Sequence, residues 1–296
     1  MAALGLGSDF GEWLSERLGV EGAAVTHDHL QSFLFVFLAL GLVASAYIKT
    51  TSRRVLRAWL RVFGVHAARL RRTAGEIERK TFHLSGLGVP MLYTHLRDRG
   101  WTHTEAISLG WATVAVIFIG DGSRLYIPFV KRNWPLKRIL REKEQNQLTG
   151  TCYYSLGCTL AFSLFSPPVA TCGVCFLVVG DMAAALIGVG YGGEIVAVKL
   201  GREGKKSIEG SLAMWFACML VGNIMFVQLP LREYPVCIAA AVATLVELFE
   251  PFGLNDNLMI PVFSGLALSW GFARLEAFCP SVIETQHLML AAQRVP

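Results

Sequence analysis

Apolar segments close to the length that crosses a bilayer recur along the whole chain. A hydrocarbon core about 30 Å thick takes about 20 apolar residues of α-helix, and eight stretches of the sequence approach that length. They are residues 32–48, 81–96, 106–127, 151–165, 169–191, 211–229, 235–249 and 258–275. Soluble domains carry about 25% charged residues, whereas this chain has 17%. We therefore predict an all-α polytopic integral membrane protein with about eight transmembrane helices.

The apolar segments divide the chain into three parts. We expect an N-terminal non-cytosolic segment over 1–31, a single membrane-embedded domain over 32–275 and a C-terminal tail over 276–296. The N-terminal segment has acidic side chains and no basic n-region, so neither a cleaved signal peptide nor a transit peptide is expected. The seven cysteines lie mostly in apolar stretches, where a thiol packs as a small hydrophobic group. No disulfide framework is indicated.

Basic residues are concentrated in three connections, 49–80, 124–143 and 199–206. Lysine and arginine in short loops mark the cytosolic side of membrane proteins, and with the eight spans placed above all three connections fall on one side. We expect that side to face the cytosol and both termini to lie on the other side. Because the net charge of +5 gathers near the bilayer, the expected partner is the membrane and not a nucleic acid.

One of these connections is also amphipathic. Over 53–72, arginines alternate with valine, leucine, tryptophan and phenylalanine, a pattern typical of a basic helix that lies on an anionic leaflet. Such a helix can serve only to orient the chain and to lie on the membrane surface, without a part in any chemistry.

Polar side chains at the cytosolic ends of the spans are the candidates for function. A carboxylate at the centre of a bilayer costs about 3 kcal/mol on insertion scales, so ionisable residues in spans usually mark a site. The first cluster lies at the start of the second span and includes Arg79, Lys80 and His83. These residues could also be a basic anchor at the membrane surface. The second cluster centres on Asp181, a carboxylate in an apolar span, for which a purely structural role is hard to find.

Small residues follow Asp181 along one helix face, which allows another backbone or a ligand to approach closely. The residues of this face are Asp181, Ala184, Gly188 and Gly192. A basic segment, GKKSIEG over 204–210, then leads into the next span. Its two lysines and the backbone amides of a helix N-terminus suit a polyphosphate. The spacing is not that of a Walker A loop, so a soluble P-loop fold is excluded.

The third cluster lies between the last two spans. It contains Glu247, Glu250, Asn255, Asp256 and Asn257. Carboxylate and amide oxygens are the ligands that Mg²⁺ prefers, and the cluster is expected at the same surface as Asp181. Alternatively, Asn255 or Asp256 caps the last helix.

These motifs resemble a known family. The pattern from Asp181 through Gly188 and Gly192 to Lys205, Lys206, Glu209 and Gly210 looks like the CTP-binding signature of the dolichol kinases, phytol kinases and CTP-dependent diacylglycerol kinases. Further similarity runs through 78–83, Asp121-x-x-Arg124, 144–150 with Tyr153, and 256–261. The short chain is most similar to the small eukaryotic CTP-dependent diacylglycerol kinases. The loop over 191–204 lacks the Pro-x-Thr that often precedes the paired lysines in dolichol kinases.

The resemblance implies a catalytic membrane domain that phosphorylates a lipid alcohol with CTP and Mg²⁺ (or Ca²⁺), with diacylglycerol as the expected substrate and phosphatidate as the product. The catalytic residues it implies are Arg79, Lys80, His83 and Asp181. The residues assigned to the nucleotide are Gly188, Gly192, Lys205, Lys206, Ser207, Glu209 and Gly210. The residues assigned to the metal ion are Asp181, Glu209 and Asp256.

Two other functions compete with this one. The first is a polyprenol (dolichol) or phytol kinase, which differs only in the lipid. The second is an ion-coupled transporter, which should place its charges near span centres and show two related halves. No repeat is visible in this sequence. The expected location is the endoplasmic reticulum or nuclear envelope, with the site facing the cytosol, in preference to a plastid membrane.

Overall fold

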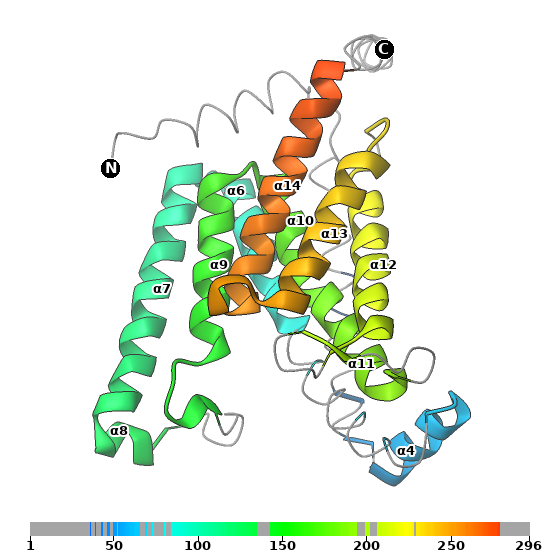
Figure 1. The fold of residues 1–296 in the computed structure, drawn as a ribbon. Coiled ribbons are helices and arrows are strands. Elements are labelled where there is room, and N and C mark those ends of the chain that lie inside the picture. The colour runs from blue at the N-terminus through cyan, green and yellow to red at the C-terminus, as the bar shows by residue number, and fades with distance from the viewer. Residues whose placement is uncertain are drawn as a thin grey trace.

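The computed structural model describes residues 53–65, 84–134, 143–193, 199–201, 206–227 and 229–278, together with single positions between 36 and 80. Within these ranges the chain folds into a bundle of helices that run roughly parallel or antiparallel to one another (Figure 1). The long elements are α7 (His103–Tyr126), α9 (Gly150–Leu164), α10 (Pro167–Cys175), η3 (Phe176–Gly180), α11 (Asp181–Tyr191), α12 (Ile208–Met225), α13 (Glu233–Phe249) and α14 (Asp256–Phe278).

Shorter elements connect and flank these helices. They are α4 (Arg53–Val62), η1 (Leu84–Leu87), α6 (Gly88–Asp98), α8 (Pro128–Arg132), η2 (Lys143–Gln145), η4 (Pro251–Gly253) and the strands β1 (Lys199–Leu200) and β2 (Lys206–Ser207). The two strands pair antiparallel, with Lys199 opposite Ser207. They fold back just before α12 begins.

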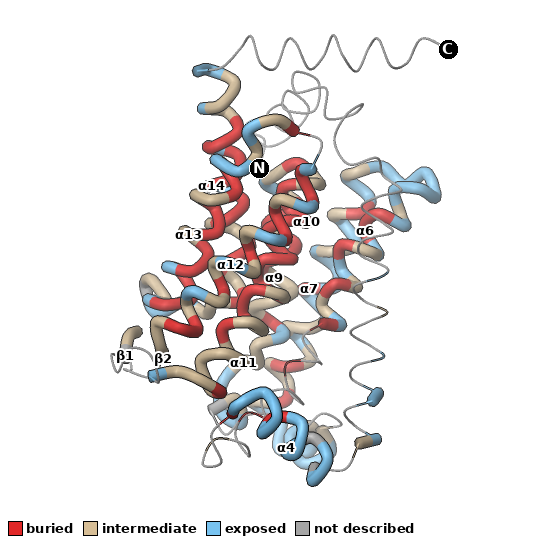
Figure 2. Tube along the Cα trace, turned by 90° about the vertical axis from the view of Figure 1, so that its right-hand side faces the viewer, coloured by how far each residue is buried: buried red, intermediate tan, exposed pale blue. Residues whose placement is uncertain are grey.

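The bundle has a buried centre and an apolar outer surface. Buried residues concentrate along α10, α12, α13 and α14 (Figure 2), and Phe176, Met214 and Ile260 are completely enclosed. On the outside, Ile119 of α7 is 72% exposed and Phe216 of α12 is 63% exposed. Water would penalise such surfaces, whereas lipid tails are as apolar as these side chains. The outer surface therefore fits a bilayer.

Four helices in the described part of the chain are long and apolar enough to cross a membrane. They are His103–Tyr126, the continuous helix Pro167–Tyr191, Ile208–Met225 and Asp256–Phe278. The all-α membrane fold is thus supported, but the count of eight spans is not confirmed. The expected spans 151–165 and 235–249 form helices of 15 and 17 residues, and most of 32–48 lies outside the described residues.

The described parts of the three basic connections lie at one end of the bundle. This end, called the polar end below, carries α4, α8, the β1–β2 pair and the first residues of α9, α12 and α14 (Figure 1). The opposite end carries the last turn of α6 and the turn between α9 and α10. The arrangement agrees with a shared side for these connections. That this side faces the cytosol stays a prediction.

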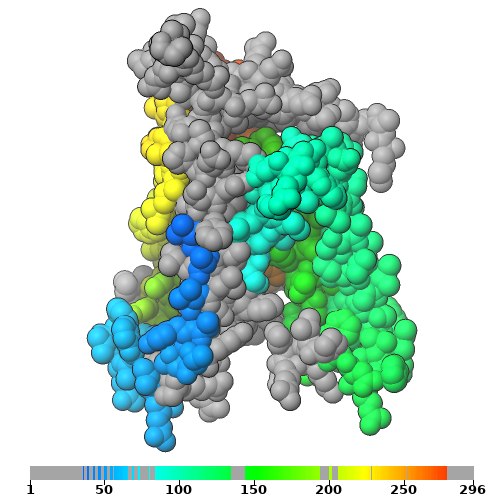
Figure 3. Space-filling model, turned by 180° about the vertical axis from the view of Figure 1, so that it is seen from behind, coloured from blue at the N-terminus to red at the C-terminus, as the bar shows by residue number. Residues whose placement is uncertain are grey.

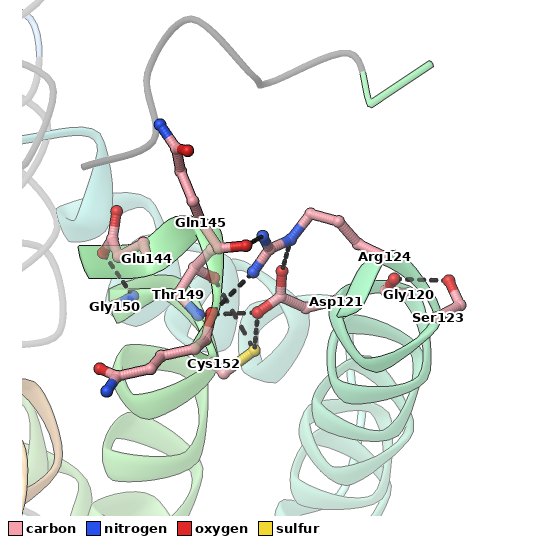
Figure 4. Close-up of polar contacts among 10 residues, drawn as sticks. Gly120, Asp121, Ser123, Arg124, Glu144, Gln145, Thr149, Gly150 and Cys152 are labelled. Carbon is pink, nitrogen blue, oxygen red and sulfur yellow. Dashed lines mark hydrogen bonds and ion pairs between the residues drawn. The ribbon is translucent and has the colours of Figure 1, made fainter. Parts of the chain in front are cut away.

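A buried ion pair attaches a polar loop to α7 at this end (Figure 4). Asp121 and Arg124 are 2% and 1% exposed, and the Arg124 Nε donates to the Asp121 Oδ1 at 2.7 Å. The guanidinium also donates to the Gln147 carbonyl oxygen at 2.7 Å. The other oxygen of Asp121 accepts from the Thr149 amide at 2.7 Å. The pair thereby fixes residues 145–149, which lead into α9.

The loop in turn positions α9 against α14. The Glu144 Oε1 accepts from the Gly150 amide at 3.0 Å, so a carboxylate sits at the positive end of the α9 dipole. A Cβ atom at Gly157 would lie only 2.6 Å from the Asn257 carbonyl oxygen. Glycine therefore permits α9 to contact the first turn of α14, which carries Asp256.

We predict that Arg124→Met strongly destabilises the protein. The substitution leaves Asp121 buried without its cation, and breaking a buried pair in this way costs about 3 to 5 kcal/mol. The unfolding temperature in detergent should fall by several degrees. Arg132→Met is the matched control, because Arg132 lies on the exposed surface of α8. Equal unfolding temperatures for the two variants would contradict the role assigned to the pair.

Candidate functional site

Asp181 stands directly after an irregular turn in a long helix. The helix from Pro167 to Tyr191 contains one π-helical turn, Phe176–Gly180, immediately before Asp181. Such turns are rare and occur often at functional sites. A Cβ at Gly180 would lie 2.7 Å from the Cys218 Sγ, so α12 approaches this turn closely. Asp181 itself is only 8% exposed.

Lys80 forms an ion pair with Asp181 and also donates a hydrogen bond to its Oδ2. The side chains are 4% and 12% exposed. The two residues are 101 positions apart in the sequence, so the fold brings together the first and second polar clusters. Two charges removed from water are stable only when each has a partner. Arg79 and His83 of the first cluster lie outside the described residues.

The small residues after Asp181 bring the backbones of α11 and α12 together. A Cβ at Gly210 would lie 2.9 Å from the Ala184 carbonyl oxygen and 3.2 Å from the Gly188 Cα. A Cβ at Gly192 would lie 2.7 Å from the Ser207 Oγ. The close approach expected from the sequence is thus made by a protein backbone. A role for Gly188 and Gly192 toward a nucleotide stays a prediction.

The first turn of α12 is held in place by two side chains. The Ser207 Oγ caps the helix by accepting from the Gly210 amide at 3.2 Å. Glu209 is 7% exposed, and its Oε1 accepts from the Gly193 amide at 3.0 Å. Glu209 therefore ties the start of α12 to the turn that ends α11. Glu209 thus has a structural role and remains a candidate ligand as well.

Lys206 pairs with the carboxylates at the end of α13. Its Nζ lies 2.8 Å from the Glu247 Oε1 and 3.2 Å from the Glu250 Oε1. Burial alone would lower the pKa of Lys206, but the charge and hydrogen bond of Glu247, with the charges of Asp256 and Glu250, raise it above its ordinary value. Lys206 thus stays a cation through neutral pH, and its stabilising effect is lost only as the pH rises through that raised pKa. Lys205 lies outside the described residues.

Asp256, the first residue of α14, interacts electrostatically with residues of the first two clusters. Its charge interacts with those of Asp181, Lys206 and Lys80. Its Oδ1 accepts from the Asn257 amide at 2.8 Å, and the Asn255 Oδ1 accepts from the same amide at 3.0 Å. Both side chains therefore cap α14, as the alternative interpretation expected. The cap also fixes the Asp256 carboxylate near the Lys80–Asp181 pair.

The described carboxylates could contribute to a metal site, but they do not form a complete set of protein ligands. Among the residues that the structure describes, no three histidine, cysteine, aspartate or glutamate side chains are close enough to hold a metal ion together. Mg²⁺ is commonly bound by one or two carboxylates together with substrate phosphates. Asp181 and Asp256 fit that smaller donor set, because their charges interact across the site. The roles of Asp181, Glu209 and Asp256 as ligands stay predictions.

The partner of Lys206 was not predicted from the sequence. Glu247 and Glu250 were expected as possible oxygen ligands, whereas both lie within ion-pair distance of Lys206. Their spacing of three residues puts them on one side of a helix end, which was the available signal. Which cation they face could not be inferred, because Lys206 and Glu247 are 41 positions apart.

Comparison with known proteins finds three relatives named CTP-dependent diacylglycerol kinase 1 and one uncharacterised protein. The chain is 29% identical over 223 residues to CTP-dependent diacylglycerol kinase 1 of Saccharomyces cerevisiae, covering 67% of this chain and 73% of that protein. It is 26% identical over 213 residues to the protein of that name in Schizosaccharomyces pombe, covering 65% and 92%. An uncharacterised protein of Rickettsia prowazekii is 27% identical over 202 residues, covering 63% and 90%. No family model matches, and no solved structure matches significantly.

We predict that Gly210→Ala destabilises the protein, although alanine normally stabilises a helix relative to glycine. The added Cβ has no room against α11, and overpacking of this kind costs about 1 to 3 kcal/mol. Gly122→Ala is the control, since a Cβ there meets nothing within 4 Å. Thermal unfolding in detergent should separate the two. A Gly210→Ala variant as stable as Gly122→Ala would show that α11 and α12 are not in close contact.

Proposed function

We propose that this chain, a member of the CTP-dependent diacylglycerol kinase family, transfers the γ-phosphoryl group of CTP to the hydroxyl group of a membrane lipid. Three relatives of that name, each matching about two thirds of the chain, support the membership. The observation that carries the proposal is the buried Lys80–Asp181 pair, with Asp256 and Lys206 within electrostatic reach, at the polar end of an apolar bundle. The lipid is diacylglycerol and the product phosphatidate.

Phosphoryl transfer needs charge neutralisation and alignment more than covalent help from the protein. Lys80 and Asp181 neutralise one another. A bound triphosphate gives Lys80 a second anionic partner, and Lys206, whose charge also interacts with that of Asp256, adds positive charge. Mg²⁺ held by Asp181 and Asp256 would neutralise phosphate charge. Because Glu209 ties the turn after α11, it keeps the start of α12 in register with Asp181.

The bilayer supplies the solvent for the rest of the lipid substrate. The tails can stay in contact with exposed apolar side chains such as Val116 and Leu220, while the hydroxyl group reaches the polar end. Arg79 and Lys205 are proposed to bind phosphates, and His83 to accept the hydroxyl proton. The proposed location is the endoplasmic reticulum or nuclear envelope, with the polar end in the cytosol.

A transporter would need its charged residues near the middle of the spans. The ion pair between Lys206 and Glu247 lies at the start of α12 and the end of α13, which favours chemistry at a membrane surface over passage of a solute. Asp181 lies within the span Pro167–Tyr191, where Lys80 neutralises its charge. A dolichol or phytol kinase would share the site and differ only in the lipid that it accepts.

We predict that the purified protein uses CTP much faster than ATP. A base is distinguished by hydrogen bonds, and a buried partner left unpaired costs about 1 to 3 kcal/mol, a preference of roughly 5- to 150-fold. Phosphatidate formation from diacylglycerol should be measured with each nucleotide at equal concentration and with Mg²⁺. Dolichol and phytol serve as competing acceptors. Equal rates with both nucleotides would contradict the donor, and transfer to dolichol or phytol alone would change the substrate.

We predict that Asp181→Asn lowers turnover by about 100-fold or more, the size of effect seen when one electrostatic group is removed from an active site. Asp98→Asn is the control, because Asp98 is exposed at the opposite end of the bundle. The single variant leaves Lys80 buried without its anion, so lost folding must be separated from lost chemistry.

A double variant makes this separation. Lys80→Met with Asp181→Asn removes both charges, and replacing a buried ion pair by neutral groups is often tolerated. The double variant should recover the unfolding temperature in detergent but not the activity. Recovery of activity together with stability would show that the pair is structural.

A further inference from the structure

Helix α4 has two exposed faces of opposite character. Val55, Trp59 and Val62 recur at spacings of four and three, so they share one side of the helix, and they are 44%, 57% and 85% exposed. The arginines at 54, 57 and 61 recur at spacings of three and four on another side and are also exposed. A soluble surface would not keep such an apolar stripe uncovered, whereas a bilayer interface accommodates both faces.

The buried side of α4 is fixed to the rest of the protein. Leu60 and Val65 are 9% and 5% exposed, and α4 lies beside the end of α11 at the polar end (Figure 2). Seen from behind the view of Figure 1, α4 projects at the lower edge of the molecule (Figure 3). Its arginine and apolar faces are thus exposed, while a third side packs against the protein.

Two hydrogen bonds connect Phe63 and Arg69, which follow α4 in the chain (together with α4, the α4 segment), to the C-terminal end of α11 and the residue after it. The Tyr191 Oη donates to the Phe63 carbonyl oxygen at 2.5 Å. The Arg69 Nη1 donates to the Gly192 carbonyl oxygen at 2.7 Å. Val65 also packs near Gly190, where an added Cβ would make an ordinary contact of 3.8 Å with its side chain. The α4 segment is therefore attached to the backbone where α11 ends.

The next residue of this turn contacts the candidate site. The Gly193 amide donates to the Glu209 Oε1 at 3.0 Å. Direct contacts thus run from α4 through Tyr191 and the turn at Gly192 to Glu209. A change in the position of α4 would therefore be transmitted to the turn at Gly192, which positions the Glu209 carboxylate.

We propose that α4 docks on anionic phospholipids of the leaflet and that docking stabilises the active arrangement of the turn at Gly192 and Glu209. The charge of α4 selects the occupant. A second copy of this chain would present the same arginines, and a nucleic acid would leave the valine and tryptophan side chains in water. An anionic leaflet satisfies both faces.

The regulatory part of this inference rests on the proposed function. The product of that reaction carries a phosphate headgroup, so accumulated product would increase docking and thereby its own synthesis. Ligands that favour one of two states shift an equilibrium only by their differential affinity. Coupling between two sites typically changes activity or affinity by about 5- to 150-fold, and we expect stimulation toward the lower end of that range.

Docking is tested without any activity measurement. The full-length protein is reconstituted in vesicles with brominated acyl chains, made of phosphatidylcholine alone or mixed with phosphatidylserine or phosphatidate. The quenching assigned to Trp59 is the difference between the native protein and Trp59→Phe. It should increase with anionic lipid and lose this increase in the triple variant Arg54→Gln, Arg57→Gln, Arg61→Gln. An unchanged increase in the triple variant would overturn the docking.

Coupling is tested by phosphatidate formation from CTP in the same vesicles. Anionic lipid should stimulate the native protein by about 5-fold or more, and the triple variant should keep its rate in phosphatidylcholine but lose the stimulation. The paired substitution Lys131→Gln with Arg132→Gln on the exposed surface of α8 is the matched control and should be stimulated normally. Tyr191→Phe should dock, by Trp59 quenching, and yet respond weakly.

The two hypotheses fail in different ways. Absence of CTP-dependent phosphorylation in every lipid would overturn the proposed function, and the quenching result would still decide the docking. A normal rate in phosphatidylcholine with no response to anionic lipid would overturn the coupling alone. Stimulation of the triple variant equal to that of the native protein would overturn the assignment to α4.

Discussion

The cost of removing charge from water organises the polar end of this bundle. Lys80 with Asp181, Arg124 with Asp121, and Lys206 with Glu247 are each partly or wholly buried, and each pair contains opposite charges. A lone buried ion would be expelled or neutralised. Pairing therefore keeps several charged groups inside an apolar fold, where a polyanionic substrate can later compete for the cations.

Close packing of the backbones of α11 and α12 is the second constraint on the site. Gly192 and Gly210 let α11 and α12 approach closely enough for Ser207 and Glu209 to contact the turn that ends α11. Because these helices are rigid and in contact, the position of Asp181 depends on the start of α12. On the other side of the bundle, the Asp121–Arg124 pair and the loop before α9 hold α9 against the turn that carries Asp256. The proposed site thus lies between α11 with α12 and α9 with the first turn of α14, and each of these helix pairs is held by its own contacts.

Membrane contact and chemistry are joined in this arrangement. The outer faces of α7 and α12 present apolar side chains, as a lipid environment requires, while the α4 segment is hydrogen-bonded to the end of α11. A kinase that acts on a membrane lipid gains from such a connection, because the surface that holds the substrate also contacts the protein beside its site. The kinase relatives, the charged cluster and the basic helix are consistent with one function at one membrane surface.

Hydropathy is a local property, so the sequence by itself determined the all-α membrane class and four long spans close to their observed bounds. Charge patterns likewise predicted that the basic connections share one end. Local patterns could not decide whether the 15 residues of α9 or the 17 of α13 cross the membrane, since that depends on neighbouring helices. Nor could they show that Lys80 pairs with Asp181, 101 residues away, or that Lys206 faces Glu247. They also could not show that the small residues assigned to the nucleotide pack against α12. Those contacts join distant segments, and only tertiary packing brings them together.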